Sequence, residues 1–184
     1  MQSEKINPLD AVGAAVAKNS AVAEGVEAHG KYTVQCIGAD GLVRWEEVID
    51  NLVVTVGKND LLDKYFTGSA YTATWYLGLV NGGTAPTYAA ADTMSSHAGW
   101  TEITGYTQAT RPQPSWSAAS AGSKATTSTS FTINASATIA GCFMTTNNTK
   151  GGTTGTLYSA GSFTTGNRAV LSGDTLNVTY TASV

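Results

Sequence analysis

The sequence is poor in charge. Only 12% of its 184 residues are charged, about half of the share in an ordinary soluble domain. Threonine, serine, glycine, alanine and asparagine fill the difference, so we expect a neutral surface rich in hydroxyl groups. The net charge is −3, and lysine and arginine form no cluster along the chain. The basic surface that binds nucleic acid is therefore excluded, and we expect no nucleic-acid partner.

Long hydrophobic runs are also missing. No apolar stretch approaches the roughly 20 residues that span a bilayer. Residues 1–10 lack the basic and apolar regions of a signal peptide. We therefore expect no membrane partner, and we expect the protein to be made in the cytoplasm and to stay there until it assembles.

Cysteine and histidine are scarce, with two of each. Cys36 and Cys142 lie in alternating patterns typical of strands, which favours two small buried side chains over a disulfide, although the sequence leaves the bridge open. His29 and His97 stand in no spacing that would form a zinc site. We expect no metal and no other cofactor.

One group of residues has the types needed for nucleophilic catalysis. His97 lies near Ser95, Ser96, Asp92 and Glu102, which supply a base, two hydroxyls and two acids. Neither serine sits in the Gly-x-Ser-x-Gly turn that presents a nucleophile. A polar loop is the better interpretation, and we expect no enzymatic activity.

What the chain has in abundance predicts strands. Threonine recurs with valine, tyrosine and tryptophan, and glycine punctuates the sequence at short intervals, which is typical of short strands joined by tight turns. We predict an all-β domain at residues 30–184: a two-sheet β-sandwich or jelly roll of about eight strands with one short helix. Residues 1–29 form a separate N-terminal arm or short helix.

The arm has a weak apolar pattern. Asn7-Pro8 is a helix start signal, and Leu9, Val12 and Val16 follow at spacings of three and four. The alanine-rich remainder offers little apolar surface to offset the entropy lost on ordering. We expect an arm that orders on a neighbouring molecule.

The first half of the domain predicts a hairpin and a helix. Residues 31–36 and 42–49 alternate between apolar and polar, and Ala39-Asp40-Gly41 separates them as a turn. Residues 51–56 continue extended. Lys58–Phe66 then reads as a helix that caps one end of the sandwich, with Leu61, Leu62, Tyr65 and Phe66 on one side.

The second half predicts a buried central strand and a long excursion. The Trp75–Val80 run is apolar without alternation, which indicates burial on both faces. The next stretch, 84–123, holds three of the four prolines and shows little periodicity. Residues 131–139 alternate like one half-buried strand. Three more strand segments follow, at 142–146, 156–163 and 169–180.

Aromatic residues offer the main candidates for binding. Six aromatic side chains could together form a stacking platform for sugar rings: Trp75, Tyr76, Tyr88, Trp100, Tyr106 and Trp116. Packing in the core is the simpler explanation for Trp75 and Tyr76. For Trp100 and Trp116, inside the proline-bearing excursion, we expect exposed anchors for a protein partner. The candidate partner-binding residues are Leu9, Val12, Val16, Trp100, Tyr106 and Trp116.

Four segments carry a resemblance to a known group of proteins. They are Asp50–Phe66, Trp75–Leu79, Ala91–Glu102 and Thr149–Leu157. Together they resemble a group of tailed-bacteriophage virion structural proteins, and the likeness extends over residues 30–180. Small β-sandwich proteins of such particles are often cement, or decoration, proteins that bridge neighbouring capsid subunits.

The resemblance implies a structural role in the virion. We expect a decoration protein on the capsid exterior that binds the major capsid protein and itself, as a dimer or trimer on capsid symmetry axes. It would stabilise the shell against the pressure of packaged DNA. The first alternative is a tail-associated domain that binds a receptor or carbohydrate. The second is a polysaccharide hydrolase that uses His97 and Glu102.

Overall fold

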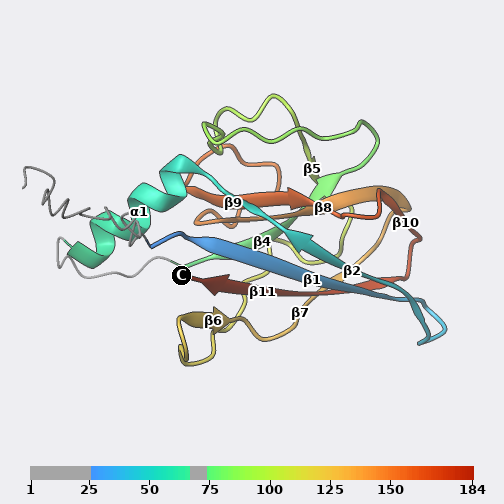
Figure 1. Ribbon diagram of the computed structural model, residues 1–184. Helices are drawn as coiled ribbons and strands as arrows, with labels where there is room; N and C mark the ends of the chain where they lie inside the picture. Colours follow the sequence, from blue (N-terminus) through green and yellow to red (C-terminus); the bar gives the residue numbers. More distant parts are fainter. Residues whose placement is uncertain (1–25, 67–73) are drawn as a thin grey trace, which may run out of the picture.

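The computed structural model describes residues 26–66 and 74–184. Two antiparallel sheets, of five and six strands, pack face to face, and a single helix of the described chain extends from one end (Figure 1). The all-β two-sheet architecture predicted from composition is confirmed, with eleven strands in place of about eight. Within the described ranges, no helix is long and apolar enough to cross a membrane.

The five-stranded sheet is organised around the C-terminal strand β11. It runs in the order β2-β1-β11-β6, and β7 pairs with β11 beside β6. Its strands are β1 (His29–Ile37), β2 (Val43–Asp50), β6 (Ser123–Ala125), β7 (Thr129–Thr132) and β11 (Thr175–Ser183).

The six-stranded sheet is organised around β8. It runs in the order β3-β9-β8-β4-β5, and β10 pairs with β8 next to β9. Its strands are β3 (Leu52–Val53), β4 (Tyr76–Asn81), β5 (Glu102–Ile103), β8 (Ala137–Thr145), β9 (Leu157–Ser162) and β10 (Arg168–Val170).

The predicted β1–β2 hairpin is confirmed. Its tip is a tight turn in which the backbone N–H of Gly41 donates to Gly38 O, and Asp40 Oδ1 accepts from the N–H of Leu42. Gly41 has φ 78°, a conformation that favours glycine because it has no Cβ. The Asp-Gly pair therefore sets the turn and with it the register of the two strands.

The main core fills the space between the sheets. On β1 the side chains of Tyr32, Val34 and Cys36 point inward at alternate positions and are fully buried. Tyr32 reaches across to the other sheet, where its hydroxyl and the Ser159 hydroxyl lie 2.7 Å apart. The period of two in the sequence therefore marks the buried face, as strand geometry requires.

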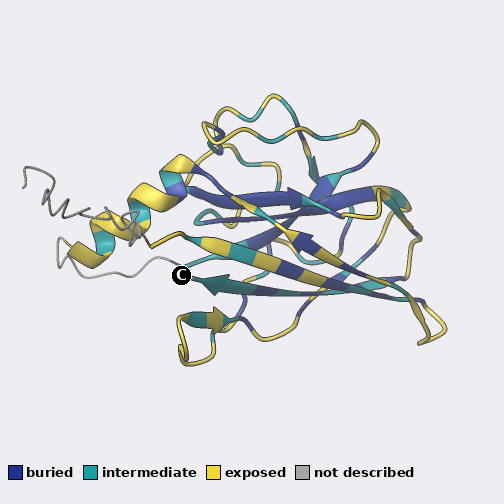
Figure 2. Ribbon diagram, viewed as in Figure 1, coloured by how far each residue is buried: buried dark blue, intermediate teal, exposed yellow. Residues whose placement is uncertain are grey.

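A second core lies on the outer side of the six-stranded sheet. Val80 and Phe143 project away from the main core and pack with Met94 and Trp100 of the excursion. β8 and β9 of this sheet are therefore drawn mostly in the dark blue of buried residues in Figure 2, and the four central residues of β4 are buried. Burial of the apolar run on both faces, predicted for Trp75–Val80, is confirmed for β4. The long excursion is confirmed too, with β5 as its one regular strand before β6.

The alternating run at 131–139 is not one strand. Phe131 belongs to β7 of the five-stranded sheet, whereas Ile139 belongs to β8 of the six-stranded sheet. A bend at residues 134 and 135 separates them. There the backbone bonds elsewhere, because the N–H of Asn134 donates to Gly105 O. Inward alternation alone did not reveal that the chain changes sheets.

The helix α1 (Thr55–Phe66) begins three residues before the predicted start. Residues 55 and 56, expected to be extended, belong to its first turn. Its position at one end of the sandwich is confirmed (Figure 1). The predicted apolar side of the helix is exposed instead of packed against the sheets (Figure 2).

Candidate protein interface

A glycine attaches α1 to the six-stranded sheet. Gly57 is the buried residue of the helix. A Cβ at this position would come within 2.5 Å of the Tyr158 carbonyl oxygen, so only glycine allows this close approach of helix and β9. The first turn of α1 is therefore fixed on the sheet, and the rest of the helix projects beyond it.

The projecting part of α1 carries two apolar stripes. Leu61 and Tyr65 form one, and Leu62 and Phe66 form the other, because residues four apart share a helix face. Leu62 is 50% exposed and Phe66 is 76% exposed. The rings of Tyr65 and Phe66 meet edge to face, with centroids 5.0 Å apart. Adjoining exposed apolar side chains of this size are typical of a surface that binds another protein.

The Leu61 and Tyr65 stripe forms one wall of an apolar groove. The groove opens at the end of the sandwich and has a volume of about 710 Å³. Both sheets contribute to it, through Met144 of β8, Tyr158 of β9 and Ala182 of β11. Trp75 and Trp116 complete the aromatic part of the lining. The groove therefore leads from the exposed helix toward the main core.

The structure brings one predicted partner-binding residue to this end. Trp116 is half-buried, lines the groove and packs against Tyr180. Leu9, Val12 and Val16 lie outside the described residues, so their role stays a prediction. The exposed stripes of α1 were missing from the candidates, because their amphipathic pattern was read as the buried side of a capping helix.

The expectation of an exposed Trp100 is wrong. Trp100 is only 4% exposed, and its indole N–H donates to Asp92 Oδ2 over 3.1 Å. Tyr106 is buried as well, between Phe131 and the ammonium group of Lys150. Burial raises the pKa of the Tyr106 hydroxyl. Both side chains pack the excursion against the sheets and are not exposed.

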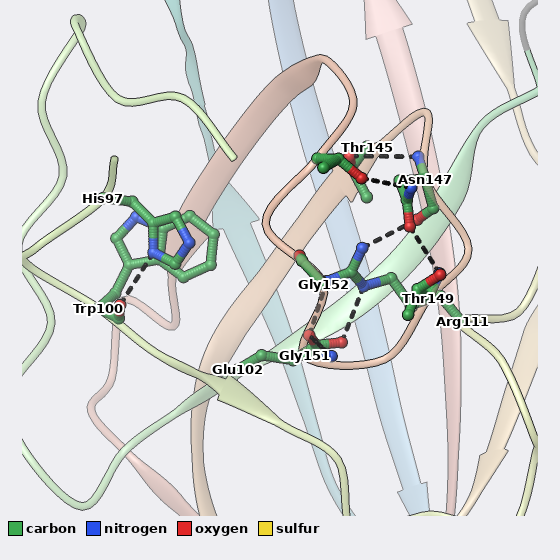
Figure 3. A network of polar contacts seen from close by, with 10 residues as sticks. His97, Trp100, Glu102, Arg111, Thr145, Asn147, Thr149, Gly151 and Gly152 are labelled. Carbon is green, nitrogen blue, oxygen red and sulfur yellow. Dashed lines mark hydrogen bonds and ion pairs between the residues drawn. The ribbon is translucent and has the colours of Figure 1, made fainter. Parts of the chain in front are cut away.

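Arg111 is a hub that fixes the excursion in place. Its guanidinium makes two hydrogen bonds to the Glu102 carboxylate, at 2.9 and 2.8 Å, and two more to the carbonyl oxygens of Asn147 and Gly152 (Figure 3). It also lies over the Phe143 ring. The side chains of Arg111 and Glu102 are only 1% and 6% exposed. With four hydrogen bonds and a buried ion pair, Arg111 joins the excursion to the β8–β9 loop.

The other two arginines of the sequence also pair with buried carboxylates. Arg44 lies 3.2 Å from Asp174, measured from Nε to Oδ1. Arg168 Nε donates to Glu47 over 2.6 Å and thereby joins β10 of one sheet to β2 of the other. The Asp174 and Glu47 side chains are almost fully buried. All three arginines thus hold the fold together and are engaged within the chain.

The possible catalytic group does not assemble. The His97 ring stacks on Trp100, and its Nδ1 lies 3.0 Å from Trp100 O (Figure 3). Asp92 binds the indole of Trp100, and Glu102 binds Arg111. Ser95 contacts the Thr93 hydroxyl. The residues are near in sequence, but each takes part in holding its own loop.

Both cysteines are buried free thiols, as the alternating patterns predicted. Burial and, next in size, the nearby Asp174 carboxylate together raise the pKa of the Cys36 thiol to about 11. Burial also raises the pKa of Cys142. In the described ranges, no group of three or more His, Cys, Asp or Glu side chains is placed to hold a metal ion. Neither a comparison with protein-family models nor one with curated proteins finds a match to this chain.

Proposed function

We propose that this protein is a decoration protein of a tailed-phage capsid, which binds the outer surface of the major capsid protein. The observation that carries the proposal is the exposed Leu62 and Phe66 stripe at one end of a closed sandwich. The resemblance of four sequence segments to phage virion proteins supplies the identity of the partner. The hydroxyl-rich, weakly charged remainder of the surface suits a protein whose other faces stay in water.

The role would be mechanical. A contact that buries about 1,000 Å² or more raises the free energy needed to separate the capsid subunits that it spans. Copies bound at repeated sites add their effects, so each contact can be weak by itself. Each bound copy would thereby oppose the outward pressure of packaged DNA. Assembly as a dimer or trimer on the shell is part of the proposal.

The test is binding of the full chain to DNA-free capsids. Phe66→Asp places a charge in the proposed contact, and we expect affinity to fall at least about tenfold, as for a hot-spot residue. Leu171→Asp is the matched control. Leu171 is an equally apolar side chain, 48% exposed, in the turn before β11, and its substitution should leave affinity within about twofold.

Cryo-electron microscopy of the intact particle provides the second readout. Regular copies on the shell, with α1 against the capsid, are the expected result. Equal binding of the two aspartate variants would contradict the proposed contact, and density confined to the tail would contradict the capsid role.

The tail-associated alternative is favoured by one observation. Trp75 and Trp116 line the groove beneath α1, and aromatic faces suit sugar rings. A glycan array separates the two functions, because a decoration protein should show no saturable binding to carbohydrate. Loss of such binding in Trp116→Ala would favour the alternative.

A further inference from the structure

The groove beneath α1 stays open in the part of the chain that the structure describes, although its walls are apolar. We infer that it is the docking site for the chain's own N-terminal segment, with Leu9, Val12 and Val16 as the contacting side chains. The inference concerns one chain alone and does not rest on the proposed function.

The path of the chain leads to this groove. Residues 1–25 join the described part at Val26, and β1 begins at His29. The first pairs of the β1–β11 ladder are His29 with Ser183 and Gly30 with Ala182. Ala182 lines the groove. The N-terminal segment therefore enters the domain at the edge of the apolar surface.

The intervening chain is long enough to reach back. Nine residues lie between Val16 and Val26, and the ten steps from one to the other span up to about 35 Å when extended. The helix that walls the groove has 12 residues, which corresponds to about 18 Å. The segment can therefore lie along the groove without strain in the connection.

The apolar pattern of the N-terminal segment complements the apolar stripe on α1. Leu9, Val12 and Val16 recur at spacings of three and four, a pattern that would share one narrow face if the segment were helical. A short segment of this kind is not stable in water by itself. Leu61 and Tyr65 present a matching stripe. Because both belong to one chain, the effective concentration is high, and docking needs less contact energy than the binding of a separate molecule.

The lining of the groove is mostly apolar, but Asp60 and Lys64 of α1 and Lys124 of β6 also contribute charged side chains. A small-molecule site would combine an apolar lining with a few polar groups that converge inside it. The buried polar side-chain atoms without a hydrogen-bond partner in the described ranges belong to Asn51, Tyr106 and Asp174. None of these residues lines the groove. An apolar segment is the occupant that this lining fits.

A pair of engineered cysteines in the full chain tests the contact. Val12→Cys with Leu61→Cys should oxidise to an intramolecular disulfide, seen as a monomer that migrates faster on a non-reducing gel. Val12→Cys with Leu171→Cys is the matched control and should not close, because Leu171 precedes β11 at the other end of the sandwich. The native cysteines are buried and should not interfere.

Labelling rates give a second readout that needs no disulfide. Leu61 and Leu62 are 38% and 50% exposed in the described structure, so single cysteines there should react at similar rates if the groove is empty. With the segment docked, Leu61→Cys should react about tenfold more slowly than Leu62→Cys, the change expected when contact protects one thiol by about 1.4 kcal/mol. Adding Val12→Asp and Val16→Asp should remove the difference.

The outcomes separate clearly. The fast-migrating monomer and the protected Leu61→Cys thiol support the inference. Disulfide-linked dimers alone would overturn it, because the occupant would then be the segment of a second copy. Equal labelling rates and no disulfide would also overturn it. Capsid binding enters neither measurement, so the proposed function can fail while this result stands.

Discussion

The outer face of the six-stranded sheet and the open end beneath α1 both present apolar side chains, but they differ in how these side chains are covered. On the outer face, the excursion covers apolar strands with Met94 and Trp100, and the Arg111–Glu102 pair fastens the cover. At the open end, α1 is attached through Gly57, and most of its apolar residues remain exposed. The first region buries its apolar side chains within the described chain, whereas the second leaves apolar side chains exposed.

The largest effect on stability should come from breaking the Arg111–Glu102 pair, which holds the excursion on the outer face of the six-stranded sheet. Arg111→Met leaves the buried Glu102 carboxylate unpaired, and we expect the free energy of unfolding to fall by about 3–5 kcal/mol, measured by urea denaturation. Lys31→Met, in the exposed pair with Asp50, is the control and should cost less than about 1 kcal/mol.

A double variant sharpens this prediction. Glu102→Leu combined with Arg111→Met removes both charges and should recover part of the lost stability, since no unpaired charge stays buried. A loss below about 1 kcal/mol in Arg111→Met would show that water reaches Glu102 and that the cover is loose.

The attachment of α1 should be the next most sensitive point. Gly57→Ala places a Cβ against the Tyr158 carbonyl, and we expect a loss of about 1–3 kcal/mol from overpacking. Lys58→Ala, at the exposed neighbouring position, should change stability by less than about 0.5 kcal/mol. Equal effects of the two variants would mean that the helix is not held through Gly57.

A smaller effect should appear as the pH rises. The pKa of Cys36 is raised from 9.0 to about 11 in the folded protein, so the unfolded state loses its thiol proton first. The stabilisation is complete below pH 9 and is lost as the pH rises toward 11, with a slope of at most about 1.4 kcal/mol per pH unit. Cys36→Ala should make the stability curve less steep over this pH range, measured by urea denaturation at each pH. Part of the remaining slope belongs to Cys142, whose pKa burial also raises. An unchanged curve would show that the thiol is not shielded.

The smallest effect should come from the open end. Leu62→Ala removes an exposed side chain, so we expect a change in the free energy of unfolding within about 0.5 kcal/mol by the same assay. A loss above about 2 kcal/mol would show that the isolated chain already buries Leu62, and that the stripe is not a free surface.

The sequence predicted the elements whose pattern is local. The Asp40-Gly41 turn and the apolar β4 run each carry their signal within a few residues, and both predictions are confirmed. The Arg111 hub could not be predicted, because its partners lie nine residues away at Glu102 and more than 30 away at Asn147. Its one signal was an arginine inside a long, nearly uncharged excursion.

The errors share a cause. Trp100 was expected to be exposed because it lies in an irregular segment, but the excursion packs as a layer of its own. The run at 131–139 alternates without interruption, although its two halves pair in different sheets. Periodicity reports which side chains face inward, and it does not report which sheet or layer they face.

The β1–β2 turn is a suitable site for attaching a tag or label. It lies at the end of the sheets opposite α1 (Figure 1), and a side chain at Gly41 would meet no neighbouring atom. A peptide tag or fluorophore inserted there would point away from any surface that the helix end binds. If the helix end binds a partner as proposed, a foreign sequence displayed at this turn would lie away from that contact.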